Sequence, residues 1–579
     1  MLQVLALIPF AALIYRVRDR LTFQFMSDWW LAKPEPLAAE PEPFQYDNFM
    51  PSRGAVRRSQ NELFRMHDKL PGPLFHLAGV FWPALESLNK LTFITGRPGS
   101  GKTTMMRMSM GSAASLFHTL PQLAQMGLIE GEGRMRWFVI DPTEAYLPLL
   151  YQVLPSDIPI LRISPDDLHG LRWDIARDIR YETDVTLLEE AAFPDSIFAT
   201  SSDSFWPREA RSLFGDIVRV FIDRGSDWEF ADVIVPLYYP QFLKPLLAQS
   251  GRTRHNVSNR LVGKLGRDIT ATASSVIRNM AIAAALWKKA PYSFSLEDFL
   301  DSRSVMHLSY SPAMIPALRG VANTLSHLLV LKALERNDKH NYTTLWLDEG
   351  RYLSDLAGLD DLVARGRGAG MGAIVSAQGL PGLVSKWTQT RVNEFRDLIN
   401  TWVTLSAGDD TAEAFSKMVG KVEGVQRSWS NSESNGSSYS SPEMFNPISE
   451  FLFGYGNPGP PPRGSNSNTH SKTNSESFQL ITKEAVLPSE ITNLPITTID
   501  NLTMNGFAFS PNTGCFQFHS SFMEYFNSLI EPPFETIPKR PPEDQILEPW
   551  NEDDLRRLNL IPTAKMITAI KRSATILRP

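Results

Sequence analysis

Cysteine is nearly absent from this chain of 579 residues, which contains only Cys515. A single cysteine excludes an internal disulfide and is typical of a protein kept in a reducing compartment. None of the 10 histidines has the spacing of a metal-ligand motif, so the sequence predicts no zinc site. The net charge of −6 excludes a generally basic surface, so any contact with nucleic acid has to be local.

The apolar run at the start of the chain, Val4–Tyr15, is short for a membrane span. As a helix it measures about 18 Å, against a hydrocarbon core of about 30 Å. No basic segment precedes it and no small-residue cleavage site follows it, so a secretory signal is not expected. Two interpretations remain open, namely a short or truncated membrane anchor whose Arg-rich end faces the cytoplasm, and a core helix.

A glycine-rich motif follows a short apolar run, 91–95, and precedes a Met-rich helical pattern. Its sequence, GRPGSGKT, has the spacing of a phosphate-binding loop. Lys102 is expected to reach the β and γ phosphates of a nucleotide, and the Thr103 hydroxyl to contact Mg²⁺. The sequence therefore predicts binding of a nucleoside triphosphate, which we take to be ATP, with Mg²⁺. The residues expected to bind it are Gly96, Arg97, Pro98, Gly99, Ser100, Gly101, Lys102, Thr103 and Thr104.

A second apolar run, YTTLWL, ends in the acid pair Asp348 and Glu349. In a protein with a phosphate-binding loop, such a pair predicts hydrolysis. Asp348 is expected to complete the Mg²⁺ shell with Thr103, and Glu349 to orient or deprotonate the attacking water. The alternative is that both carboxylates cap the next helix.

The segment LVARGRGAGMGAIVSAQ comes next and offers three more candidate catalytic residues. Gln378, at the end of a predicted strand, is placed to sense the γ phosphate. Arg365 or Arg367 could complete the site of a neighbouring subunit, because a cation on the transferred phosphoryl group speeds the reaction by about 10³–10⁵. Both arginines could equally lie on a solvated helix end.

Apolar runs alternate with helical patterns over much of the chain, which is typical of a parallel sheet covered on both faces. We therefore predict an α/β fold with a P-loop (RecA-like), mostly parallel sheet, interrupted by an all-α insertion. The predicted parts are an apolar N-terminal anchor (1–30), a linker (31–60), the nucleotide-binding domain (61–173 and 296–530), the all-α insertion (174–295) and a C-terminal tail (531–579). The Ser/Asn-rich arms within 427–477 are expected to form a flexible loop, with a polar hairpin as the alternative.

Basic residues gather in 251–290, within the predicted insertion, against the single acid Asp268. Arg260, Lys264 and Arg267 are our candidate contacts to DNA phosphates, without base readout. A solvated helix face is the alternative.

Taken together, the P-loop, Asp203-Ser204-Phe205-Trp206, and the segments LWLDEG and ARGRGAGMGAIVSAQ, in this order along the chain, resemble the coupling-protein ATPases of type IV secretion and conjugation, the TraG/TraD type. These belong to the wider FtsK/HerA class of DNA translocases. The resemblance implies an ATP-hydrolysing hexamer that delivers DNA or nucleoprotein to a secretion channel. It also implies secretion-channel or relaxosome partners, and a location at the cytoplasmic face of the membrane with membrane contact through residues 1–20.

Members of this family usually begin with two membrane spans, of which this chain has at most a fragment, so a purely cytoplasmic location remains the alternative. Two other functions also remain open. One is a soluble double-stranded DNA pump of the HerA/FtsK kind. The other is a receptor for secretion substrates that uses ATP for assembly, for which the Ser/Asn-rich arms and the acidic tail would be suited.

Overall fold

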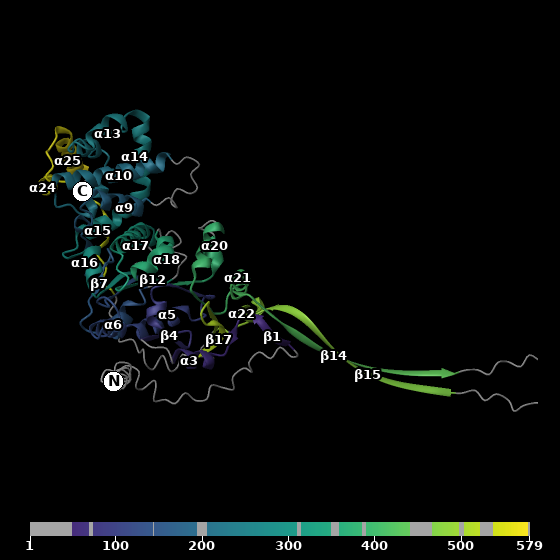
Figure 1. Cartoon of the computed structure of the whole chain (residues 1–579). Coiled ribbons are helices and arrows are strands. Elements are labelled where there is room, and N and C mark those ends of the chain that lie inside the picture. The colour runs from purple at the N-terminus through teal and green to yellow at the C-terminus, as the bar shows by residue number, and fades with distance from the viewer. Residues whose placement is uncertain are drawn as a thin grey trace, which may run out of the picture. The chain divides into compact units, whose positions relative to one another are not determined.

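The structure is a computed structural model that describes ten ranges of the chain (Figure 1). The predicted anchor, 1–30, lies outside them, as does most of the predicted linker. The described residues form two compact units: one holds Val56–Val419 and Val486–Pro579, and the other holds the residues up to Ala55 with Gly420–Ala485. The described ranges are 49–68, 73–142, 144–193, 205–309, 314–348, 358–384, 389–439, 466–496, 503–521 and 537–576.

A ten-stranded sheet forms the centre of the first unit, in the order β2-β17-β16-β13-β5-β12-β11-β6-β10-β7. Neighbouring strands from β13 to β7 are all parallel, whereas β16 and β17 continue the sheet as antiparallel strands. The predicted mixed α/β fold with a mostly parallel sheet is therefore confirmed. The strands are β2 (Arg57–Arg58), β5 (Leu91–Thr95), β6 (Met135–Asp141), β7 (Ile160–Arg162), β10 (Val305–Ser309), β11 (Tyr342–Leu347), β12 (Met371–Ala377), β13 (Thr401–Thr404), β16 (Thr503–Ser510) and β17 (Gly514–Ser521).

The central strands are buried along their whole length because helices cover both faces of the sheet. Three aromatic rings mark the packing on one face: Trp137 lies 5.0 Å from Phe117 and 5.3 Å from Trp346, centroid to centroid. The helices associated with the sheet are α5 (Lys102–Ala113), α6 (Leu116–Gln125), α7 (Leu147–Val153), α16 (Leu296–Asp301), α17 (Ile315–Arg336), α18 (Leu359–Arg365), α19 (Leu380–Val384), α20 (Gln389–Leu398), α21 (Asp409–Val419) and α22 (Pro488–Thr492), with the 3₁₀ turn η4 (Gly366–Ala369).

A helical region separates the two halves of this sheet in sequence. It begins after β8 (Arg172–Trp173) and ends before β9 (Ser293–Phe294), and these two strands pair in parallel, so the region leaves and re-enters at one place. These limits lie close to the predicted insertion, 174–295. Its helices are α8 (Ile175–Asp178), α9 (Glu182–Ala192), α10 (Phe205–Arg224), α11 (Phe230–Tyr238), α12 (Leu243–Leu247), α13 (Arg254–Asn259), α14 (Gly263–Ile277) and α15 (Met280–Lys288).

The C-terminal segment differs from the predicted tail, 531–579, because residues 537–576 pack against this insertion. Trp550 is only 1% exposed, and its indole N–H donates to Asp232 at 3.0 Å. Arg557 donates to both oxygens of the same carboxylate, at 2.9 and 3.0 Å. Figure 1 shows the C-terminal helices, in yellow, beside those of the insertion. The elements are η5 (Pro542–Gln545), α24 (Glu552–Arg557) and α25 (Ala564–Ile576).

The second unit is a sheet in the order β1-β14-β15. The expected flexible loop at 427–477 is wrong for the arms, because β14 (Lys421–Tyr439) and β15 (Asn466–Glu484) pair in antiparallel register from end to end. The predicted linker is also wrong at its end, because β1 (Phe49–Gly54) pairs with β14.

The remaining elements lie ahead of the P-loop and are α3 (Gln60–Asp68), β3 (Leu74–Leu77), β4 (Val80–Pro83) and α4 (Ala84–Ser87). Within the described ranges, no single helix is both long and apolar enough to cross a membrane, whereas α14 and α15 meet that criterion together, as a pair bent by 66°.

Candidate functional site

The glycine-rich loop connects β5 to α5 at the carboxyl edge of the parallel strands. Gly99 and Gly101 have φ angles of +77° and +101°, a region that favours glycine, and they turn the chain into the first residue of α5. The loop is tied to both neighbouring strands, because the Gly96 N–H donates to Ala377 O at 3.3 Å and the Arg97 N–H donates to Ser406 O at 2.6 Å. The backbone N–H groups of the first turn of α5 therefore lie at the edge of the sheet where anions bind.

Lys102 lies across this loop. Its ammonium group donates to Gly96 O at 2.9 Å and to Arg97 O at 3.3 Å, and the residue is only 7% exposed. The side chain thus folds back onto the carbonyl groups of its own loop. A phosphate group bound in the loop would contact this ammonium group directly.

Asp348 follows β11 and meets the P-loop helix. Its Oδ2 accepts a hydrogen bond from the Thr103 hydroxyl at 3.2 Å and another from the Tyr146 hydroxyl at 2.7 Å. Its Oδ1 accepts from the hydroxyl of Ser376, on the neighbouring strand β12. Asp348 is 1% exposed, so hydroxyl groups rather than water surround it. The sequence-predicted pair of Thr103 and Asp348 is therefore side by side.

Tyr146 is held by a second buried acid, Asp141, at the end of β6. The Tyr146 N–H donates to Asp141 Oδ2 at 2.8 Å, and His307 Nε2 lies 3.2 Å from the same oxygen. Burial works to raise the pKa of Asp141, but hydrogen bonds from His307 and the backbone outweigh it, so this pKa is below its ordinary value. Burial, and then the Asp348 carboxylate, raise the pKa of Tyr146 well above its ordinary value. Tyr146 is therefore a neutral donor that faces Asp348.

Two other predicted residues belong to the same edge of the sheet. Gln378 directly follows β12, whose last residue pairs with Thr95, so Gln378 lies next to the start of the P-loop. Glu349 lies outside the described residues, and its role stays a prediction.

Arg365 and Arg367 lie at the opposite edge of the sheet. They precede β12, whose residue Ala373 donates from its N–H to Lys90 O, just ahead of β5. A strand of seven residues spans about 23 Å, so neither arginine reaches the P-loop of its own chain. Arg365 pairs with Asp361 at 2.6 Å, whereas Arg367 is exposed.

The donor set at the P-loop edge suits a phosphate chain and a hard divalent cation. A Cβ at Gly99 would meet nothing within 4 Å, so the loop has open space on that side. The Thr103 hydroxyl and the Asp348 carboxylate are oxygen ligands of the kind that Mg²⁺ prefers. The residues present therefore fit Mg²⁺ with a nucleotide.

The basic cluster of the insertion is partly neutralised. Arg260 donates to Ser212 at 2.8 Å and pairs with Glu209 at 3.3 Å, so little of its charge is available to a ligand. Lys264 and Arg267 are exposed and lie three residues apart on α14, and therefore on one face of that helix. A basic surface remains at this pair.

Sequence reasoning missed Tyr146, Ser376 and His307, which complete the surroundings of Asp141 and Asp348. Two features of the sequence could have indicated these residues: Asp141 ends a buried strand, and Ser376 interrupts an otherwise apolar strand. Only the order of the strands shows that these residues meet, because β6 lies between β10 and β11, and β12 lies beyond β11.

Comparison with known proteins finds similarity to coupling proteins of type IV secretion and conjugation. A family model described as the type IV secretion-system coupling protein DNA-binding domain matches residues 75–508. The bacterial conjugative coupling protein TrwBdeltaN70, in an unbound form, aligns with a TM-score of 0.60 at 17% identity, over 81% of this chain and 93% of that chain. The plasmid coupling protein TrwB, solved with the ATP analogue ADPNP, aligns with a TM-score of 0.58 at 17% identity, over 81% of this chain and 94% of that chain.

TrwB has also been solved with ADP and Mg²⁺, and that structure aligns with a TM-score of 0.59 at 17% identity, over 81% of this chain and 94% of that chain. A search among curated proteins finds no match. At this level of identity, the solved structures show that the fold is shared.

Proposed function

The chain belongs to the type IV secretion-system coupling proteins that carry this DNA-binding domain, and from this premise we propose that it hydrolyses ATP to move DNA towards a secretion channel. One observation carries the proposal: the Thr103 hydroxyl donates to Asp348 Oδ2 at 3.2 Å. This contact joins the P-loop helix to the acid-ended strand, and ATP-driven motors of this class hold Mg²⁺ between these two elements.

The proposed roles of the residues follow from their chemistry. When bound, Mg²⁺ neutralises charge on the β and γ phosphates of ATP. The Lys102 ammonium leaves the loop carbonyls and binds phosphate oxygens, while Thr103 and Asp348 hold the cation. Glu349 accepts a proton from the attacking water. Gln378, next to the P-loop, senses whether the γ phosphate is present.

Arg365 or Arg367 acts in the site of a neighbouring subunit in this proposal. Their exposure to solvent and their distance from the P-loop of their own chain support it. We therefore propose a closed ring, with six subunits as in the class that the sequence resembles. The exposed pair Lys264 and Arg267 contacts DNA phosphates without reading bases.

The proposed location is the cytoplasmic face of the membrane, with membrane contact through residues 1–20, where a channel would receive the DNA. Secretion-channel and relaxosome proteins are the proposed partners. This location and these partners are what the resemblance of the sequence to coupling proteins implies.

The test is the rate of ATP hydrolysis with and without DNA at several salt concentrations. We expect DNA to raise the rate of the wild type, and Glu349→Gln to lower it by at least about 10², the usual size of a lost general-base contribution. Lys102→Ala should also lower the rate, because the loop loses the cation that binds the β and γ phosphates. Lys417→Ala is the matched control, because that lysine is exposed on α21 and distant in sequence from the P-loop.

The experiment tests the catalytic assignment and DNA translocation separately. If Glu349→Gln hydrolyses ATP at the wild-type rate, the catalytic assignment is wrong. If hydrolysis requires Lys102 but is indifferent to DNA at every salt concentration, the protein is an ATPase but not a DNA translocase.

A further inference from the structure

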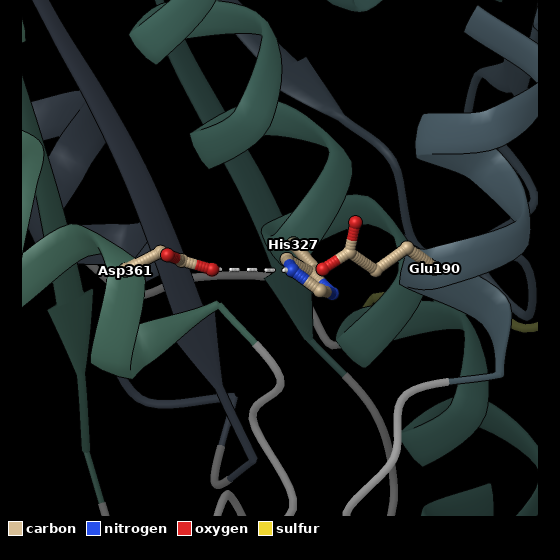
Figure 2. A group of neighbouring side chains, drawn as sticks. All are labelled: Glu190, His327 and Asp361. Carbon is tan, nitrogen blue, oxygen red and sulfur yellow. Dashed lines mark ion pairs between the residues drawn. The ribbon is translucent and has the colours of Figure 1, made fainter.

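Three side chains that could bind a metal ion meet away from the P-loop. Glu190 comes from α9 of the insertion, His327 from α17 and Asp361 from α18, and one ligand atom from each lies within 4.8 Å of the other two. Figure 2 shows the imidazole of His327 between the two carboxylates, which approach from different helices. Among the residues that the structure describes, this is the one group of three such side chains.

The imidazole is held in place by its surroundings. His327 is 4% exposed, and Gly358 lies against it with a φ of +91°. A Cβ at Gly358 would come within 2.7 Å of His327 Cδ2 and 2.9 Å of its Cα, so only glycine permits this approach. The imidazole ring is thus packed directly against the backbone of Gly358, which fixes its position.

The separation of His327 and Asp361 suits a shared ion. His327 Nε2 lies 3.7 Å from Asp361 Oδ2, which is too long for a hydrogen bond. Two ligands at about 2.1 Å from one metal ion lie no more than about 4.2 Å apart, so an ion fits between these atoms. The other oxygen of Asp361 is bound by Arg365 at 2.6 Å, which orients the carboxylate towards His327.

Charge also favours a cation. The carboxylates of Glu190 and Asp361 lie within 4.8 Å of each other and repel. Glu190 is exposed and Asp361 is half-buried, so an ion can enter from solvent. A nitrogen ligand with two carboxylates suits zinc and neighbouring transition metals better than Mg²⁺, which prefers oxygen ligands only.

We propose that Glu190, His327 and Asp361 bind one divalent transition-metal ion of the zinc class, with water at the remaining positions. The ion ties α9 of the insertion to α17 and α18, and therefore to the helix that ends in Arg365. This proposal is independent of ATP hydrolysis. It differs from the sequence-based prediction of no zinc, which rested on spacing motifs, whereas these three ligands are far apart in the chain and form no such motif.

Calorimetry with Zn²⁺ tests the site on the full chain, without a histidine tag and without nucleotide, in excess Mg²⁺. We expect one Zn²⁺ per chain and a higher unfolding temperature with Zn²⁺. Glu190→Gln removes an exposed ligand without disturbing the core, and it should weaken Zn²⁺ binding at least about tenfold. Glu190→His should restore the affinity, because imidazole replaces the lost carboxylate as a ligand.

Glu130→Gln is the matched control, since Glu130 lies 3.0 Å from another histidine, His340, and the described residues add no third ligand to this pair. Its Zn²⁺ affinity should equal that of the wild type. The proposal is overturned if the folded wild type binds no Zn²⁺ in excess Mg²⁺, or if Glu190→Gln and Asp361→Asn both bind Zn²⁺ as tightly as the wild type does. Stability that depends on pH but not on Zn²⁺ would show that a proton on His327 supplies the positive charge instead.

Discussion

Replacing Tyr146 with phenylalanine removes one hydroxyl from the surroundings of Asp348 and leaves the ring in place. The Tyr146 hydroxyl donates to Asp348 Oδ2 at 2.7 Å, and the residue is 1% exposed, so no water is at hand to replace it. A hydrogen bond to a charged group contributes about 1.5–3 kcal/mol. Losing a hydrogen bond to a metal-binding carboxylate typically weakens metal affinity by about 10- to 100-fold, which is the same range.

We therefore expect Tyr146→Phe to raise the free Mg²⁺ concentration for half-maximal ATP hydrolysis by about 10- to 100-fold. The rate at saturating Mg²⁺ should change less, because Lys102 and Thr103 are intact. The assay is a titration of Mg²⁺ at fixed ATP. Tyr342→Phe is the matched control, because this buried tyrosine lies at the other end of β11 from Asp348.

An unchanged Mg²⁺ requirement in Tyr146→Phe would refute the reasoning that this hydroxyl positions Asp348. A lowered requirement would also refute it, since the phenol would then compete with the cation for the carboxylate. A change of equal size in Tyr342→Phe would point to a general loss of packing.

Three further predictions follow from the same structure. Reversing the charges of Lys264 and Arg267 to Glu should weaken DNA binding at all sequences and lower the salt slope by about one unit per lost phosphate contact, as measured by fluorescence anisotropy; an unchanged slope would move DNA contact elsewhere. Arg367→Ala should lose ATPase activity alone but regain part of it when mixed with a subunit whose P-loop lysine is disabled, and no recovery on mixing would count against action in the neighbouring subunit. Arg557→Ala leaves the buried Asp232 carboxylate without its cation, which typically costs about 3–5 kcal/mol, so limited proteolysis should cut the C-terminal segment faster than in the wild type. Equal cutting would mean that this pair does not secure the segment.

The P-loop could be predicted from the sequence because all its parts are neighbours in the chain. Glycines, Lys102 and Thr103 act through backbone geometry and helix position, both of which are local. Asp348 was also predictable, because it ends a continuous apolar strand. Its meeting with Thr103 required only that both strands run parallel with their carboxyl ends at one edge.

The surroundings of Asp348 could not be predicted, because they depend on strand order. Tyr146 and His307 reach the site only because β6 lies between β10 and β11 in the sheet. Composition led to wrong predictions for two other segments, the C-terminal segment and the Ser/Asn-rich arms. The C-terminal segment is rich in proline and charge, yet Trp550 and Arg557 bind a carboxylate of the insertion. The Ser/Asn-rich arms lack apolar alternation, yet their backbones pair along 19 residues.

The bonds between Asp232 and the C-terminal segment bear on how the protein is made. Trp550 lies 318 residues after Asp232, and Arg557 lies 325 residues after it. At about 5–20 residues per second, a ribosome needs roughly 15–65 s to supply those partners. During that interval the Asp232 carboxylate of the nascent insertion lacks its two partners, because Trp550 and Arg557 have not yet been synthesised. The insertion is thus completed by a segment that is synthesised more than 300 residues later, and changes that remove this segment alter a domain whose own sequence they leave intact.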